Sequence, residues 1–123
     1  MKFTLDRPGT LHVVRGYAPG QLRIGELEYA RSVIVSATTL IDDWRPQHIG
    51  ELTAADLEPA LALKPQVLLL GSGARQVFPS PELLAQLYAA RIGFEVMVAG
   101  AACRTYNVLV GEGREVAAAL IIA

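Results

Sequence analysis

The sequence predicts an α/β fold with a mixed central sheet and a β addition at its N-terminus. Apolar runs of strand length occur at residues 67–70 and 94–98, and an amphipathic helix pattern lies between them. This order is a βαβ unit, whose two strands should be parallel and whose crossover should be right-handed. Residues 11–36 contain short strand-like pieces separated by turn residues, without a sustained helical period.

The first third of the chain predicts a β-meander that leads into one buried strand. Residues 17–20, Tyr-Ala-Pro-Gly, suit a turn, because proline presets φ and glycine supplies a positive φ. Residues 32–36 are a continuous run rich in β-branched side chains, as expected of a strand covered on both faces. Residues 37–49 have the composition of a loop, in which Trp44 is expected to close one side of the core.

Two helices are predicted in the middle of the chain. Thr53 and Asp56 have the spacing of a capping box, and Pro59 should keep the helix that follows short or kinked. Ser80 and Pro81 suit the N-cap and first turn of a second helix, which connects the two strands of the βαβ unit. Its expected apolar face consists of Leu83, Leu84, Leu87, Tyr88 and Ile92, with Gly93 as the C-terminal stop.

The C-terminal region predicts one more helix and one more strand. The helix should span about residues 101–110. Residues 115–122 form an apolar run of strand length, although their alanines leave a helix as the alternative.

Composition places the chain among globular proteins with one domain over residues 1–123. Its 52% apolar and 19% charged residues predict a packed core rather than disorder. The net charge is -1, and the nine arginines and two lysines are scattered along the chain without forming a basic stripe. Nucleic acid is therefore not an expected partner.

The sequence also argues against a membrane span and against a metal centre. No apolar run reaches the roughly 18 residues that a membrane helix needs, and the N-terminal residues 1–8 lack the apolar region of a leader. We therefore expect a cytoplasmic protein. The single cysteine, Cys103, and the distant His12 and His48 do not have the spacing of a zinc site, and no cofactor is predicted.

A candidate site follows from the βαβ topology. Both strand ends that lead into helices lie at the same edge of a sheet, where open α/β folds usually bind ligands. The Gly71-Ser72-Gly73 loop and the start of the last helix should therefore be neighbours, with arginines close enough to help hold an anion. The candidate ligand-binding residues are Gly71, Ser72, Gly73, Arg75, Cys103, Arg104, Thr105 and Asn107.

Several of these residues have a structural interpretation beside the functional one. Cys103 in the first turn of a helix and beside Arg104 could be a reactive thiolate, but a buried, inert cysteine is the favoured interpretation. Tyr106 should be a core residue whose hydroxyl finds a partner near the rim. The amide of Asn107 should tether loop backbone and fix the crevice, with direct ligand contact as the alternative.

Known catalytic and nucleotide-binding motifs are not matched. The Rossmann pattern begins at Gly71 and Gly73 but has Gln76 in place of the third glycine. A P-loop is excluded because no Gly-Lys-Ser or Gly-Lys-Thr occurs. A triad of Ser72, His48 and Asp43 lacks the nucleophile elbow of a hydrolase. No catalytic residue is assigned, and the sequence favours a non-catalytic protein.

Four segments resemble one family of proteins. They are Gly16-Tyr17-Ala18-Pro19-Gly20, Leu69-Leu70-Gly71-Ser72-Gly73, Ala102-Cys103-Arg104-Thr105-Tyr106-Asn107-Val108-Leu109 and Glu112-Gly113-Arg114. In this order they resemble the domain-of-unknown-function family 498. Its eukaryotic relatives include a mitochondrial assembly factor for respiratory complex I and an adipogenesis-associated protein.

This resemblance implies a three-layer fold with a central mixed sheet, helices and an additional β layer from the N-terminal half. It implies no known reaction. The chain departs from the family pattern at Ser72, where threonine is more common, and at Ala99, near which a threonine is common.

Two functions are compatible with the sequence. The leading hypothesis is a non-catalytic interaction or assembly-factor-like module with a protein partner. The alternative is a small-molecule or anion-binding protein that uses the Gly71-Ser72-Gly73 loop and the start of the last helix, with Cys103 as a possible reactive centre. The sequence identifies neither the partner or ligand nor the oligomeric state.

Overall fold

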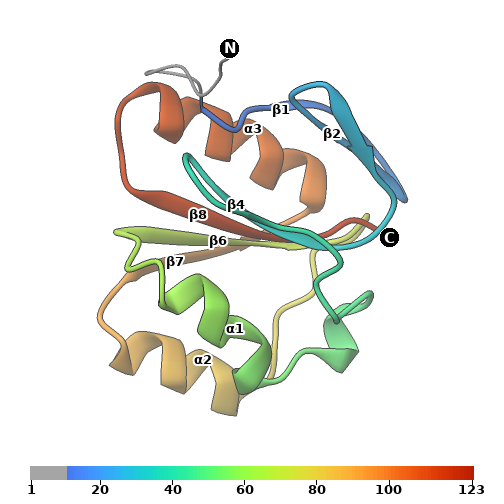
Figure 1. The fold of residues 1–123 in the computed structure, drawn as a ribbon. Coiled ribbons are helices and arrows are strands. Elements are labelled where there is room, and N and C mark those ends of the chain that lie inside the picture. Colours follow the sequence, from blue (N-terminus) through green and yellow to red (C-terminus); the bar gives the residue numbers. More distant parts are fainter. Residues whose placement is uncertain (1–10) are drawn as a thin grey trace.

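The structure, a computed structural model, describes residues 11–123 and is built around a five-stranded sheet (Figure 1). The prediction that residues 1–8 lack the apolar region of a leader concerns residues outside this described range. The strands of this sheet are β4 (Val33–Ser36), β5 (Leu40–Ile41), β6 (Val67–Ser72), β7 (Gly93–Met97) and β8 (Val116–Ile121). Their order is β5-β4-β8-β6-β7. Because β6 is parallel to β7 and β8 while β4 is antiparallel to β8, the sheet is mixed as predicted.

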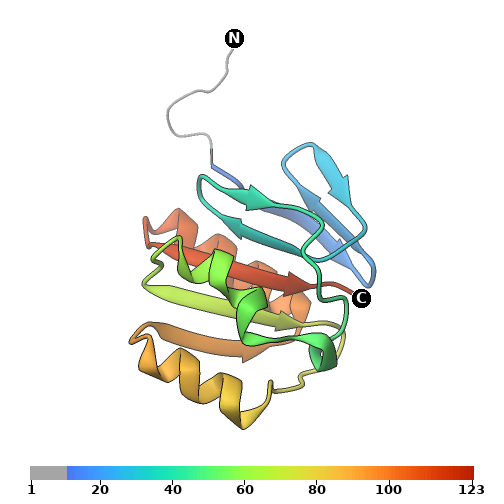
Figure 2. The same ribbon diagram turned by 60° about the horizontal axis from the view of Figure 1, so that its bottom comes forward.

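A second, three-stranded sheet forms the N-terminal β addition. It consists of β1 (Val14–Ala18), β2 (Gln21–Ile24) and β3 (Leu27–Tyr29), which pair antiparallel in sequence order. Figure 2 shows this meander as a separate group of strands, and in Figure 1 it lies on the same side of the central sheet as α3. The predicted additional β layer is therefore confirmed.

Three α-helices and one 3-10 helix complete the described chain. They are η1 (Ile49–Glu51), α1 (Ala54–Leu61), α2 (Pro81–Ala89) and α3 (Ala99–Gly111). Helices α1 and α2 cover one face of the central sheet, while α3 and the β1–β3 sheet cover the other (Figure 1). The result is three layers, with the central sheet in the middle.

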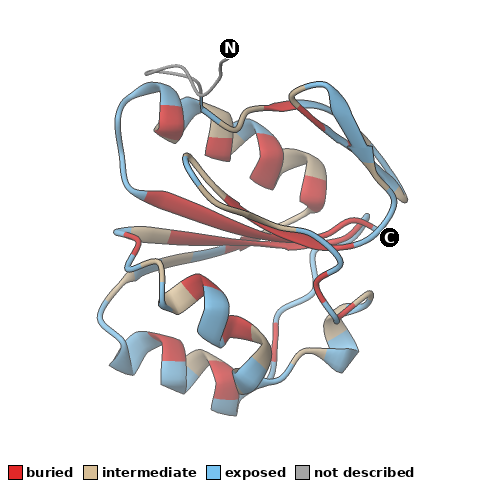
Figure 3. Cartoon of the chain, viewed as in Figure 1, coloured by how far each residue is buried: buried red, intermediate tan, exposed pale blue. Residues whose placement is uncertain are grey.

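Apolar side chains fill both interfaces of the central sheet, and Figure 3 marks in red the buried residues of its strands and of the helices that face it. All six residues of β8 are buried, because this strand lies between β4 and β6 and is covered on both faces. The run of residues 115–122 is therefore a strand, and the helical alternative is wrong. Tyr106 is fully buried and lies in the apolar cluster that α3 forms with the two sheets.

The predicted caps of α1 and α2 are present. Thr53 and Asp56 form a capping box at α1, and the Ser80 hydroxyl accepts a hydrogen bond from Leu83 N at 3.2 Å. Trp44 is 5% exposed, and its indole donates to the Asp56 carbonyl at 2.8 Å. Trp44 therefore closes the core beside α1, as its position in the sequence predicts.

Three local predictions need correction. Helix α3 begins at Ala99 rather than near residue 101, because Gly73 O accepts the Ala99 N–H and caps the first turn. Gly93 begins β7 rather than ending α2; the left-handed residue after that helix is Arg91, at φ 61°. Tyr88 is 68% exposed, because α2 lies at the surface and only one narrow side of it contacts the sheet.

No helix formed by residues 11–123 has both the length and the apolar character needed to span a membrane.

Candidate functional site

The predicted crevice edge exists as a contact between the glycine loop and the start of α3. Strands β6 and β7 end at the same edge of the sheet, and Ala99 N donates to Gly73 O at 2.8 Å. The loop and the helix are therefore neighbours, as the βαβ topology predicts. This hydrogen bond also occupies the first backbone N–H of α3, which the anion hypothesis leaves free for a ligand.

Close packing accounts for both glycines of the loop. A Cβ on Gly71 would lie 3.0 Å from Leu120 Cδ2 and 3.2 Å from Ala99 Cα, so only glycine lets α3 approach β6 this closely. Gly73 has φ +92°, a conformation that favours glycine, and a Cβ there would lie 3.1 Å from Ala123 O. The space beside these two glycines is filled by the protein itself.

Ser72 acts within the loop that follows β6. Its hydroxyl donates to Arg75 O at 2.5 Å and accepts from Val77 N at 3.1 Å. Gln76 Nε2 also donates to Val96 O at 3.0 Å, which ties the loop to β7. The side chains of Ser72 and Gln76 therefore hold the backbone of the loop, while Arg75 is exposed. A ligand-binding role for this loop stays a prediction.

Cys103 lies in the second turn of α3 and is 4% exposed. Burial raises the pKa of the Cys103 thiol to about 11, and the opposing charge of Arg104 is too weak to reverse this effect. A reactive thiolate requires a lowered pKa, which the burial of Cys103 opposes, and the reactive role stays a prediction. The structure agrees with a buried, inert cysteine.

We predict that Cys103 of the folded protein is alkylated at least about a hundred-fold more slowly than a model thiol at pH 7, because its thiolate is scarce and shielded. Mass spectrometry after timed iodoacetamide treatment measures the rate. The unfolded protein is the control and should react like the model thiol. A native rate equal to the model rate would show that the thiol is accessible and activated.

Tyr106 and Asn107 connect α3 to the N-terminal β layer. The Tyr106 hydroxyl donates to His12 O at 2.8 Å. Asn107 Oδ1 accepts from Val14 N at 2.9 Å, and Asn107 Nδ2 donates to Val14 O at 2.8 Å. The tether predicted for Asn107 therefore exists, but it holds the β1 backbone rather than the glycine loop.

The eight candidate residues divide into separate groups. Gly71, Ser72, Gly73 and Arg75 belong to the end of β6 and its loop. Cys103, Arg104 and Asn107 line a pocket of about 200 Å³ between α3 and β1. Thr105, half-buried on α3, is not among the residues that line this pocket. The single crevice that the sequence predicts does not bring all eight residues together.

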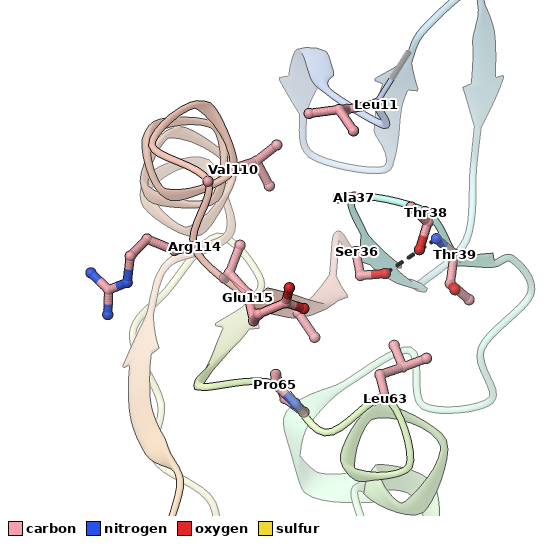
Figure 4. A pocket seen from close by; sticks show the side chains of 13 residues that line it. Leu11, Ser36, Ala37, Thr38, Thr39, Leu63, Pro65, Val110, Arg114 and Glu115 are labelled. Carbon is pink, nitrogen blue, oxygen red and sulfur yellow. Dashed lines mark hydrogen bonds between the residues drawn. The ribbon is translucent and has the colours of Figure 1, made fainter. Parts of the chain in front are cut away.

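Another pocket, of about 310 Å³, opens near the C-terminus of α3 (Figure 4). Leu11, Leu63 and Val110 approach it from three sides in this view, and Arg114 points away. The remaining wall includes the turn after β4, in which Ser36 Oγ accepts the Thr39 N–H at 3.2 Å. The walls combine apolar side chains with polar ones such as Thr38 and Thr39, and Glu115 is the acidic residue among them.

Sequence reasoning named the α3 residues of the smaller pocket but not its β1 wall, and it missed the larger pocket. Their walls combine residues far apart in the chain, such as Arg15 with Arg104 and Leu63 with Glu115. The only local signal was the Gly16–Gly20 segment, which the family resemblance includes but which carries no recognisable binding pattern.

Comparison with known proteins finds relatives that resemble this chain in sequence and in fold. A protein of Xanthomonas campestris, solved by NMR, is 38% identical, with a TM-score of 0.84, covering 99% of this chain and 92% of that chain. A Mth938-like domain of Bordetella pertussis is 29% identical, with a TM-score of 0.79, covering 98% of this chain and 91% of that chain. The "13 kDa major membrane protein" of Francisella tularensis subsp. holarctica is 31% identical over 106 residues, which are 85% of this chain and 86% of that protein.

The family model described as "Protein of unknown function (DUF498/DUF598)" matches residues 14–121. This match confirms the resemblance carried by the glycine loop and the Thr105-Tyr106-Asn107 segment. The chain belongs to the DUF498/DUF598 family.

Proposed function

We propose that the protein is a non-catalytic interaction module that presents the loop between β6 and α2 to a protein partner. The observation that carries this proposal is the exposure of two adjacent apolar side chains on a well-anchored loop. Phe78 is 62% exposed and Val77 is 40% exposed. An exposed aromatic residue is a common anchor of protein interfaces.

The loop is held in place before any partner binds. Ser72 bonds to both Arg75 and Val77, and Gln76 bonds to Val96. These contacts reduce the conformational entropy that the loop would lose on binding, which favours affinity. The exposed Arg75 adds a residue type that is enriched at interfaces. We therefore assign an apolar protein segment as the ligand of this surface.

The chemistry of the described residues supports an interaction role over catalysis. Ser72 and Asn107 use their polar groups in contacts with backbone, and burial keeps Cys103 protonated. The assembly-factor-like character of the proposal rests on the family resemblance rather than on these contacts. Small-molecule binding at the glycine loop gains no support, because the loop's hydroxyl and glycines are engaged internally.

Replacing Val77 and Phe78 together with serine should abolish recovery of the partner from native lysate. The two side chains are exposed, so the melting temperature should change little. Val108→Ser is the matched control, because Val108 is 58% exposed but lies on α3, on the other side of the central sheet. Affinity capture followed by mass spectrometry compares the three proteins.

The proposal requires a protein that the wild type and the Val108→Ser control both recover and the double variant loses. Equal recovery by the double variant would place the interface elsewhere. Failure of the wild type to retain any protein would reject the interaction role.

A further inference from the structure

The pocket between β1 and α3 has a charge pattern that the proposed interaction role does not use. We infer that this pocket binds a compact oxyanion, namely a phosphate or carboxylate group. Arg15 of β1 and Arg104 of α3 both line it, and its other lining residues include no carboxylate. Two guanidinium groups without an acidic neighbour in the same concave site favour an anion.

Neither arginine is neutralised by an ion pair within the described chain. The salt bridges among residues 11–123 join Arg31 to Asp43 and Arg45 to Asp56. An adjoining pocket of about 280 Å³ shares Arg15, Gly16 and Tyr17 and also contains Glu28, but Glu28 does not line the pocket of Arg104 itself. The positive charge of the pocket is therefore available to a ligand.

The Arg104 guanidinium and the Tyr17 ring both lie close to Gly100, in the first turn of α3. Arg104 Nη1 is 3.6 Å from the position that a Cβ on Gly100 would occupy, and Tyr17 Cδ2 is 3.5 Å from the same position. Because Gly100 has no Cβ, both groups have room beside this turn of the helix.

The opposite wall is set by an irregularity in β1. The pairing of β1 with β2 shifts between Val14 and Gly16, which leaves Arg15 as the extra residue of a β-bulge. Bulges redirect a side chain relative to the regular ladder. Asn107 fixes this wall to α3 through both of its hydrogen bonds to Val14, so the backbone beside Arg15 is held next to the helix that carries Arg104.

The size of the pocket limits the ligand. Its volume of about 200 Å³ is smaller than the roughly 300 Å³ at which pockets for drug-sized ligands begin. A single phosphate or carboxylate group fits this scale, and any larger remainder of the molecule would lie outside. Arginine recognises both groups through paired N–H donors, so the two share one recognition chemistry.

Titration with inorganic phosphate, and separately with acetate, tests this site at constant ionic strength set with chloride. Amide resonances of Gly16 and Gly100 should shift and saturate with at least one of the two anions, and the anion that saturates identifies the preferred group. Arg15→Gln and Arg104→Gln should each weaken the affinity at least about tenfold, because each removes a charge-assisted donor. Arg91→Gln, which removes an exposed arginine outside the pocket, should bind like the wild type.

The assignment would be overturned if these amide shifts stayed linear with concentration for both anions. It would also be overturned if a titration with chloride alone produced the same shifts. Equal affinity in Arg104→Gln and Arg91→Gln would also overturn it, because the response would then come from general surface charge. Melting temperatures of all three variants show that each remains folded. The outcome is independent of partner capture through Val77 and Phe78.

Discussion

Replacing Tyr106 with alanine should lower the free energy of unfolding by about 3–5 kcal/mol, the range for removing a buried aromatic side chain. Tyr106 is fully buried within the cluster between α3 and the two sheets. Its loss would leave a cavity there and would leave the His12 carbonyl without its hydrogen bond. Urea unfolding followed by circular dichroism measures the change.

Tyr106→Phe separates the two contributions. It keeps the ring and removes only the hydroxyl that donates to His12 O, so the expected loss is about 1–2 kcal/mol. Burial also raises the pKa of Tyr106, so this hydroxyl stays a donor across the physiological range. If Tyr106→Ala lowered the free energy of unfolding by less than about 1 kcal/mol, the result would contradict the position of this ring in the core.

Asn107→Leu should lower the free energy of unfolding by about 2–4 kcal/mol, because it removes partners from two backbone groups at once. The Asn107 amide accepts from Val14 N and donates to Val14 O. Val14 is 7% exposed, so water replaces these bonds poorly. Chemical denaturation gives the energy, and amide hydrogen exchange should report faster opening of Val14.

Two further substitutions sharpen this result. Asn107→Asp keeps an acceptor for Val14 N but directs a carboxylate at Val14 O, so it should not restore the stability at pH 7. Val108→Ala changes the next, exposed residue of the same helix and should cost about 0.5 kcal/mol or less. Unchanged exchange at Val14 in Asn107→Leu would show that the β layer does not depend on this tether.

Local chemistry made much of the fold predictable. Ser80 and Pro81 identify the start of α2 because an N-cap hydroxyl and an N1 proline satisfy needs that arise within one turn. The buried strand at residues 33–36 is visible as a β-branched run, since a strand covered on both faces needs apolar side chains at every position. Each of these signals depends on only a few residues that are close together in the sequence.

Predictions failed where long-range contacts decide the outcome. Helix α3 begins at Ala99 because its cap is the Gly73 carbonyl, a group that local sequence does not identify. Tyr88 has the spacing of an apolar face, but the sheet contacts only a narrower side of α2. The sequence could not show how wide that contact is.

The candidate site was predictable in location but not in chemistry. The βαβ topology places Gly71 and Gly73 beside the start of α3, and glycine there is explained equally by ligand access or by close packing. Only the distances to Ala99 Cα and Ala123 O favour packing. Arg15 could not be paired with Arg104 from sequence, because a β-bulge and a distant helix bring them to one pocket.

The central claim is that the loop after β6 meets a protein partner, while the polar residues beneath it hold the fold. A photo-crosslinking amino acid placed at Phe78, compared with one at Val108, tests this claim in intact cells. We predict a discrete protein adduct from position 78 and none from position 108, followed by identification of the adduct by mass spectrometry. The same adduct from both positions, or none from position 78, would contradict it.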